Sequence, residues 1–477
     1  MSPQDSPTDH NYEDRCPIGF DGDDPAWAIA ATQPRPHREV QDEVVTKKTE
    51  QTKRDFTSDR FLPVAPESLQ QSGLSTAQLE ALIAKFLLNT GTAIGRKIAR
   101  QMCLPFGLIE RVLHTMRLDQ LVAIKSEGAL GDYLFELTSS GIERARRYSE
   151  QTSYFGAAPV PLARYIEGAE KQSVRHETVD MERVRHAFSH LVVGQKLLRQ
   201  MGEAMNMGCS LFIYGEPGNG KTTLSESINR AYSKTIWIPR AIYVGGEIVR
   251  LFDPIHHEEC PLPEGHPDRE RVDNRWVRIK RPTITVGGEL ELSDLDVATN
   301  PVTHINEASL QLKANCGTLV FDDFGRNRFR PAELLNRLIY PLENRVDALH
   351  ASSGRTFRVP FDCLVVFATN LDPMALVDEA FLRRVPFSIH IEDPSEDEFR
   401  QVFHAVAREL DVQFQPDQLE YLIHNHYRQA NRSMRFCHPR DIIANIKNAC
   451  EFRGDEPRVT NETIDSAIAS MLSLRAS

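Results

Sequence analysis

A glycine-rich loop directly after a short apolar run constrains this chain more than any other feature. Leu211–Tyr214 predicts a buried strand, and the residues after it predict a helix that opens with the loop Gly215-Glu216-Pro217-Gly218-Asn219-Gly220-Lys221-Thr222-Thr223. The loop has the pattern G-x-x-x-x-G-K-[ST], in which glycines let backbone N–H groups approach phosphates at a helix N-terminus. Lys221 is expected to reach the β- and γ-phosphates, and the Thr222 hydroxyl to coordinate Mg²⁺. We therefore predict a site for ATP and Mg²⁺.

A second apolar strand, Leu319–Phe321, ends in two carboxylates. After a phosphate-binding loop, this arrangement predicts that Asp322 holds the hydrated Mg²⁺ and that Asp323 polarises the attacking water. From about His176 the pattern alternates strands and helices, which predicts a parallel sheet flanked by helices in the α/β class. From about Glu396 only helical patterns remain, at 396–410, 416–429, 439–452 and 460–472.

In this order the motifs resemble the AAA+ ATPase superfamily, from about His176 to the C-terminus. The resemblance implies that Val193-Gly194-Gln195 helps to hold the nucleotide. The strand Cys363–Asn370 is similar to sensor 1, so Asn370, with Thr369 beside it, is expected to position the water. Many members of the superfamily carry Asp-Glu where this chain has Asp322-Asp323. Since Asp-Asp versions occur among active relatives, hydrolysis is still expected, and the effect of the shorter side chain on turnover stays open.

Two arginine positions also follow from the resemblance. The segment Ala380–Arg384 stands where the superfamily carries its arginine finger, so Arg383 or Arg384 is expected to enter the site of a neighbouring subunit. The segment His438–Asp441 is similar to sensor 2 in a helical lid, which places Arg440 at the phosphates of its own subunit. For each arginine, the alternative is a surface salt bridge or a helix cap.

The stretch between the loop and Asp322 is longer than a minimal βα unit needs. Strands are predicted at 241–244, 247–252 and 276–279, and the segment 285–292 then precedes a helix predicted at 307–314. This layout is similar to that of MoxR-type and enhancer-binding AAA+ ATPases. His256-His257-Glu258-Glu259-Cys260 invites a metal interpretation, but consecutive residues seldom converge on one ion, so a polar loop is favoured.

The region before the nucleotide-binding module has the order of a winged helix. Helices are predicted from Ser75, over 94–102 and over 106–116, followed by strands at 121–125 and 133–137 and a helix at 139–148. Ser75–Ser149 contains ten Lys or Arg and seven Asp or Glu, a balance of 10 − 7 = +3. The candidate recognition helix offers Glu110, Arg111, His114 and Arg117, and Lys125 follows. This is a weak basic signal, so docking of a protein is favoured over DNA binding.

Composition limits the remaining classes. A net charge of −11 argues against a protein that coats nucleic acid, and eight scattered cysteines without a C-x-x-C pair fit reduced thiols in the cytoplasm. Neither a secretory signal nor an apolar run long enough to span a membrane is present. The predicted domains are a disordered tail (1–62), a winged-helix-like α+β domain (63–150), a linker (151–175), the AAA+ α/β subdomain (176–394) and the helical lid (395–477).

The leading hypothesis is a cytoplasmic AAA+ ATPase that hydrolyses ATP with Mg²⁺ and remodels a protein client as a homo-oligomeric ring, expected to be a hexamer. The ring follows from the arginine finger, because a residue acting in trans needs a neighbouring subunit. The competing hypothesis is an ATP-switched regulator that binds DNA through residues 63–150. A third, an inactive nucleotide-binding scaffold, is disfavoured by the intact set of site residues.

Overall fold

The computed structural model describes residues 61–128, 131–208, 210–351, 354–377 and 379–473. The chain divides at Ser58 into two units, and the account below concerns the second, Asp59–Ser477. The predicted disordered tail, 1–62, lies outside the described residues except for its last two positions.

A five-stranded parallel sheet forms the centre of the α/β module. Its order is β10-β13-β16-β5-β17, and all four neighbouring pairs are parallel. The strands are β10 (Thr283–Val286), β13 (Thr318–Phe321), β16 (Leu364–Thr369), β5 (Leu211–Gly215) and β17 (Phe387–Ile391). Every residue of β13 and β16 is buried, as expected for strands covered on both faces.

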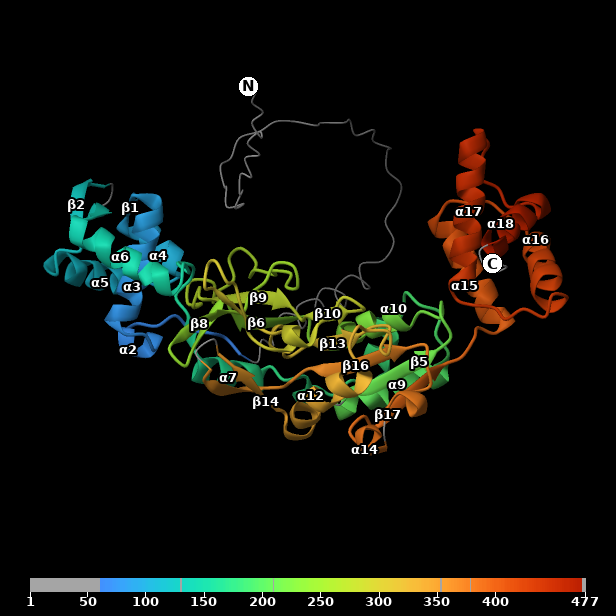
Figure 1. The fold of residues 1–477 in the computed structure, drawn as a ribbon. Coiled ribbons are helices and arrows are strands. Elements are labelled where there is room, and N and C mark those ends of the chain that lie inside the picture. The colour runs from blue at the N-terminus through green and yellow to red at the C-terminus, as the bar shows by residue number, and fades with distance from the viewer. Residues whose placement is uncertain (1–60, 129–130, 209, 352–353, 378, 474–477) are drawn as a thin grey trace, which may run out of the picture. The chain divides into compact units, whose positions relative to one another are not determined.

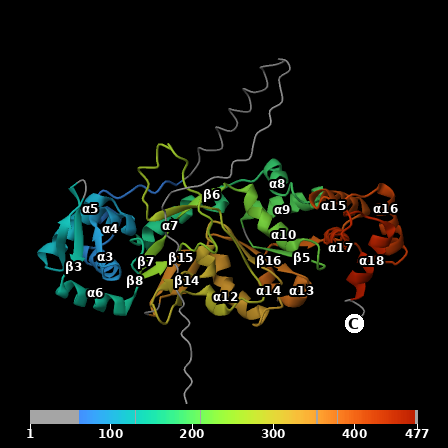
Figure 2. The same ribbon diagram turned by 90° about the horizontal axis from the view of Figure 1, so that it is seen from above.

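Alternate residues of these strands enter two separate cores. Leu211 and Ile213 pack with helices α8 (Met181–Ala187), α9 (Gln195–Met207) and α10 (Lys221–Ser227), whereas Phe212 packs with α12 (Pro331–Asn344) and α14 (Glu379–Leu382). The period of two places a helical layer on each face of the sheet, which can be followed in Figure 2. The predicted α/β fold with a parallel sheet flanked by helices is confirmed.

The segment between the phosphate loop and β13 builds a separate core. It contains β6 (Thr235–Pro239), β7 (Ala241–Val244), β8 (Glu247–Arg250), β9 (Trp276–Lys280), η4 (Leu292–Leu295), β11 (Ala298–Thr299), β12 (Asn306–Glu307) and α11 (Leu310–Lys313). The strands predicted at 241–244, 247–252 and 276–279 are present. The helix predicted at 307–314 was wrong at its start, because Asn306 and Glu307 pair with β8 and β11. The sheet here has the order β11-β12-β8-β7-β4.

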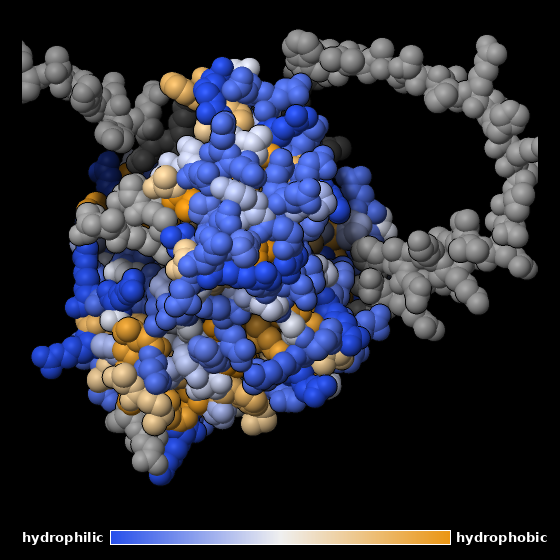
Figure 3. Space-filling model, turned by 90° about the vertical axis from the view of Figure 1, so that its right-hand side faces the viewer, coloured by the Kyte–Doolittle hydropathy of each residue, from blue (hydrophilic) through white to orange (hydrophobic). Residues whose placement is uncertain are grey.

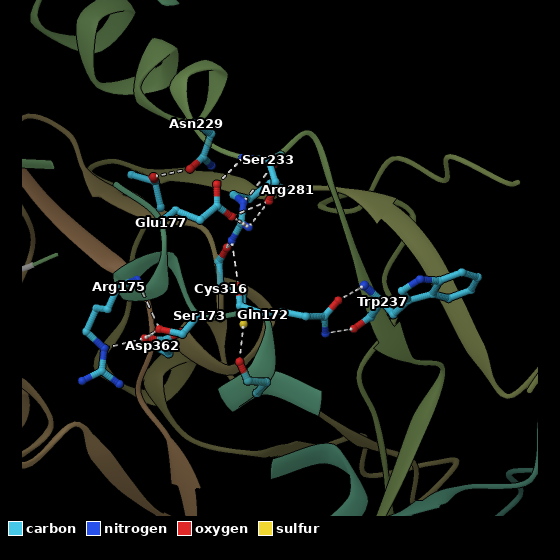
Figure 4. A network of polar contacts seen from close by, with 12 residues as sticks. Gln172, Ser173, Arg175, Glu177, Asn229, Ser233, Trp237, Arg281, Cys316 and Asp362 are labelled. Carbon is cyan, nitrogen blue, oxygen red and sulfur yellow. Dashed lines mark hydrogen bonds and ion pairs between the residues drawn. The ribbon is translucent and has the colours of Figure 1, made fainter. Parts of the chain in front are cut away.

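Residues of the predicted linker also enter that core. They form β4 (Val160–Pro161), α7 (Leu162–Lys171) and η2 (Val174–His176). Tyr165 and Ala169 of α7 are buried against β6–β9 and against the hairpin β14 (Val346–His350) and β15 (Thr356–Pro360). A network of buried polar groups centred on Arg281 then ties 172–177 to the sheet (Figure 4).

The N-terminal part of the unit has its own hydrophobic core. Its elements are α2 (Leu69–Ser72), α3 (Thr76–Thr90), β1 (Thr92–Ile94), α4 (Gly95–Met102), α5 (Phe106–Leu118), β2 (Val122–Glu127), β3 (Tyr133–Leu137) and α6 (Ser139–Gln151). Ser75 and Gln78 form a capping box at the start of α3, as the serine at this position indicates. The three strands form an antiparallel sheet with the order β1-β3-β2.

The C-terminal part is entirely helical within the described residues. It contains α15 (Glu396–Glu409), α16 (Pro416–Tyr421), the π-helix η5 (Leu422–Arg428), α17 (His438–Arg453) and α18 (Asn461–Ser473), around a core of their apolar faces. Figure 1 shows these helices in orange and red, and Figure 3 shows a face on which hydrophilic side chains predominate. We call this part the lid. In the described part of the chain, no helix is both long and apolar enough to cross a membrane.

Candidate functional site

The predicted site residues converge where three parallel strands end. Gly215 closes β5, Asp322 follows β13 and Asn370 follows β16, and these strands are neighbours or next-neighbours in the sheet. Since parallel strands end at one edge, the loop, the carboxylates and the amide are brought together there. This edge is where open α/β sheets bind their ligands.

Lys221 lies at the centre of the site. Its Nζ donates to the carbonyl oxygens of Gly215 and Glu216, both at 3.0 Å, and to Oδ1 of Asn370. Burial lowers the pKa of the Lys221 amine, while the charges of Asp323 and Asp322 act in the opposite direction. The ammonium group is therefore held by neutral oxygens of the loop, without a carboxylate in direct contact among the described residues.

The Thr222 hydroxyl and the Asp322 carboxylate meet beside Lys221. Thr222 Oγ1 donates to Asp322 Oδ2 at 2.8 Å. A hydroxyl and a carboxylate are hard oxygen donors, and Mg²⁺ takes one or two such protein ligands and completes its shell with water and phosphate oxygens. The pair thus fits the predicted magnesium site.

Asp323 has a strained backbone and a specific partner. Its φ is +48°, in the left-handed region that few residues other than glycine adopt. Its Oδ1 accepts a hydrogen bond from Nδ2 of Asn370 at 3.0 Å, so Asn370 bridges Lys221 and Asp323. Strain of this kind is found where a side chain must be held in one functional position. The structure thus places the expected base, amide and lysine in one hydrogen-bonded chain.

The phosphate loop also contacts the lid. Gly218 has a φ of +84°, and a Cβ there would lie 2.5 Å from Sγ of Cys437, so only glycine fits. The Cys437 N–H donates to the Gly218 carbonyl at 2.9 Å, and Asn219 Nδ2 donates to Asp393 at 2.8 Å. Arg435 forms ion pairs with Asp393 and, at 3.1 Å, with Glu216. Sequence reasoning missed Arg435 and Asp393, because no local motif distinguishes them from surface charges.

A cavity of about 700 Å³ opens between the loop, the lid and the segment before α9. Its wall combines Gly218–Gly220 and Thr223 of the loop with apolar side chains, among them Leu191, Val193, Leu197, Val402 and Val406. The volume is within the range of ligand sites, and an apolar wall beside a phosphate loop suits a nucleobase. Of the expected segment 193–195, Val193 and Gly194 line the cavity, whereas Gln195 accepts a hydrogen bond from Arg185 at 3.3 Å.

The three predicted arginines lie in different surroundings. Arg440 lines the cavity, and its guanidinium forms an exposed ion pair of 2.6 Å with Glu409. Arg384 is paired with Glu343 of α12 at 2.5 Å. Arg383 is exposed. Thr369 is buried, and its hydroxyl donates to the Phe324 carbonyl at 2.7 Å, so its contact is with the turn after β13.

In the segment His256–Cys260, His257 has a structural role. Nδ1 of His257 accepts the Asp253 N–H at 3.0 Å, and Nε2 lies 3.0 Å from the Lys313 carbonyl, which only accepts. Both ring nitrogens are thus used, and burial lowers the pKa of His257 to about 4. Among the described residues, no group of three or more His, Cys, Asp or Glu side chains is arranged to hold a metal ion.

Parallel sheet, phosphate loop and converging carboxylates together define a P-loop module of the α/β class. Residues 395–470 match the family model described as a domain of unknown function (DUF8689). The comparison with curated proteins gave no match.

Solved structures with similar folds include NtrX from Brucella abortus, with 13% identity, a TM-score of 0.37 and coverage of 59% of this chain and 57% of that one. This chain therefore spans less than two thirds of the NtrX chain. The RuvB Holliday junction branch migration motor of Thermotoga maritima has 12% identity and a TM-score of 0.33, with coverage of 62% and 73%. At these levels the likenesses say nothing further about activity.

Proposed function

We propose that this chain is an AAA+ ATPase that binds ATP with Mg²⁺ and hydrolyses it to ADP and phosphate. The observation that carries the proposal is the hydrogen-bonded chain Lys221–Asn370–Asp323 beside the Thr222–Asp322 pair. These groups supply a cation for the phosphates, two oxygen ligands for Mg²⁺ and a carboxylate base on one edge of the sheet. The adjacent cavity is of a size to hold the base and sugar.

The geometry assigns a role to each group in hydrolysis. Lys221 exchanges its loop carbonyls for the β- and γ-phosphate oxygens, and Thr222 and Asp322 hold Mg²⁺, which neutralises phosphate charge when bound. Asn370 orients the attacking water towards the γ-phosphorus, and Asp323 accepts a proton from it. The water oxygen bonds to the γ-phosphorus as the bond between that phosphorus and the β–γ bridging oxygen breaks. The electron pair of the broken bond stays on the bridging oxygen of the departing ADP.

The arginine finger bears on how this ATPase would act on a partner. The trans-acting finger is Arg383 or Arg384, and the Arg384 guanidinium is also paired with Glu343 of its own subunit. A finger that acts in trans requires a homo-oligomeric ring, and we expect a hexamer that remodels a protein client. The part at 63–150, which we expect to be a winged-helix-like domain, would recruit the client.

Steady-state ATP turnover of the purified chain across a concentration series tests this function. Turnover per subunit should rise as the ring forms, and Lys221→Ala should reduce it at least ~100-fold, as should Arg383→Ala or Arg384→Ala. Lys97→Ala, an exposed lysine on α4, is the matched control and should leave turnover unchanged. Normal turnover in Lys221→Ala would exclude hydrolysis at this loop.

A second candidate function rests on the surface of α5. Glu110, Arg111, His114 and Arg117 are all exposed, whereas the apolar residues between them are buried. This face could enter a DNA groove, which would make the protein an ATP-switched regulator. Duplex binding that requires Arg111 and Arg117 and changes with ATP would support this function. Binding that is unaffected by Arg111→Ala and Arg117→Ala would exclude it.

A further inference from the structure

The turn that follows Asp322-Asp323 is fixed to the sheet. Phe324 is fully buried, and its ring packs against Phe367 with centroids 5.1 Å apart. Its N–H donates to the Ala368 carbonyl at 2.8 Å, and its own carbonyl accepts from Thr369 Oγ1 at 2.7 Å. Because Phe324 is anchored through its side chain and both backbone groups, the residues beside it have defined positions.

This turn directs the chain back to the site at Arg326. The Arg326 N–H donates to the Asp323 carbonyl at 3.0 Å, and Gly325 between them has a φ of +99°. A Cβ at Gly325 would lie 2.9 Å from Leu376, so the turn packs closely on the segment after β16. Arg326 is thereby held next to Asp323 by the backbone of its own subunit.

Among the residues that the structure describes, the Arg326 side chain has no ion-pair partner. It is exposed, and within the described ranges no carboxylate lies at ion-pair distance from it. Its charge does reach the centre of the site, since burial lowers the pKa of Lys221 and Arg326 lowers it further. Neighbouring cations repel each other, and an anion bound near both relieves that repulsion.

We propose that Arg326 contacts the γ-phosphoryl group of the nucleotide bound by its own subunit and stabilises the negative charge that develops there during hydrolysis. The inference rests on the proposed function and adds to it a cation that acts in cis. Arg383 or Arg384 would come from a neighbouring subunit and Arg440 from the lid, so both cations depend on how those parts are placed. The position of Arg326 relative to Asp323 depends only on the turn, so this cation is present before assembly or lid closure.

The test uses the full chain and compares Arg326→Ala with Arg328→Ala. Arg328 is the matched control, because it lies on the same loop, is exposed and likewise has no ion pair among the described residues. The readouts are kcat for ATP, the Kd for ADP, and the Kd for ADP with aluminium fluoride, which mimics the transferred phosphoryl group.

For Arg326→Ala we expect kcat to fall about 100-fold, with a similar loss of affinity for ADP with aluminium fluoride and a change of at most about threefold for ADP alone. Arg326→Lys should recover part of the loss, since it keeps the charge but not the planar fork. Arg328→Ala should resemble the unaltered chain. A kcat within threefold in Arg326→Ala, equal losses for both ligands, or the same losses in Arg328→Ala would overturn the inference.

Mixed subunits distinguish action in cis from action in trans. Arg326→Ala subunits are combined with inactive Lys221→Ala subunits, whose own Arg326 is intact. No recovery of turnover is expected, because each subunit needs its own Arg326, whereas recovery would show that the arginine serves a neighbour. If the unaltered chain does not hydrolyse ATP, the proposed function itself fails. If the unaltered chain hydrolyses ATP and Lys221→Ala does not, the proposed function holds, and the Arg326 variants then test the inference about Arg326 alone.

Discussion

Two clusters of charged side chains in this module use the same residue types for different ends. At the phosphate loop, Lys221 is held by neutral oxygens, Asp323 is exposed with a left-handed backbone, and Arg326 has no ion pair among the described residues. Around Arg281 the opposite holds. Its guanidinium and Glu177 form a 2.7 Å ion pair whose side chains are only 2% and 7% exposed.

In the buried cluster, the Arg281 guanidinium is satisfied within the fold (Figure 4). Arg281 also donates to the carbonyls of Gln172, Ser233 and Cys316, and the second Glu177 oxygen accepts the Ser233 N–H at 2.7 Å. Every N–H donor of the Arg281 guanidinium is used, and these bonds join the segment 172–177 to the strands. In the cluster at the phosphate loop, exposed charged groups can still bind a ligand. A structural cluster of charged side chains therefore differs from a binding cluster in its burial and in how many of its polar groups have partners, not in its residue types.

The largest effect is expected from breaking the buried cluster. Arg281→Met leaves Glu177 as an unpaired buried charge and should lower the free energy of unfolding by about 3–5 kcal/mol, measured by urea denaturation. Arg281→Met combined with Glu177→Met should recover most of the loss, because no charge then remains buried without a partner.

The control for this prediction is Arg400→Met in the lid. Arg400 is paired with Glu396, Asp397 and Glu420 on the surface, so the change should be below about 1 kcal/mol. If Arg281→Met lowered the free energy of unfolding as little as Arg400→Met, the buried cluster would not be more important for stability than exposed ion pairs.

Asp323→Asn should alter chemistry with little change in stability. Asparagine tolerates the left-handed backbone and can still accept from Asn370, but it cannot take a proton. Turnover should fall about 100- to 1,000-fold, with the midpoint of thermal unfolding unchanged. Asp411→Asn is the matched control, because Asp411 is also exposed and has a φ of +54° but lies in the lid. A matching loss of turnover in both variants would contradict the role of Asp323.

The sequence predicted the loop cluster and not the buried one. The motif around Lys221 fixes the spacing of its residues, and Asp322 and Asn370 each end an apolar strand, so the rule for parallel sheets brings them together. Arg281, Glu177 and Asp362 are far apart in the chain and have no local signature. Their meeting depends on how the segment 172–177 packs, which the sequence pattern indicated only as a linker.

His257 provides a test of the buried class by pH. Its pKa is about 4 in the folded chain, against about 6.5 when unfolded, so the folded state disfavours the protonated ring. The stability from neutral His257 is complete above about pH 6.5 and is lost as the pH falls from there towards 4. At pH 5 the loss should be about 2 kcal/mol.

His257→Gln should remove this part of the acid sensitivity, because glutamine does not titrate. Urea denaturation at pH 7.5 and pH 5 measures the difference for both chains. His404→Gln, which replaces an exposed histidine of α15, is the comparison variant. An unchanged pH dependence in His257→Gln would show that the buried ring does not stay neutral.

The smallest effect is expected at the exposed edge of the loop cluster, where Glu409 holds Arg440 at 2.6 Å in the wall of the cavity. A phosphate group must compete with this carboxylate for the arginine, and Glu409 also adds negative charge to the site of an anion. Glu409→Gln should therefore tighten the Kd for ATP about two- to fivefold, most clearly at low ionic strength. Glu451→Gln on α17, which is 4.0 Å from Lys447, should leave the Kd unchanged. Weaker ATP binding in Glu409→Gln would mean that the ion pair positions Arg440 for the nucleotide, and the loop cluster would then share the satisfied character of the buried one.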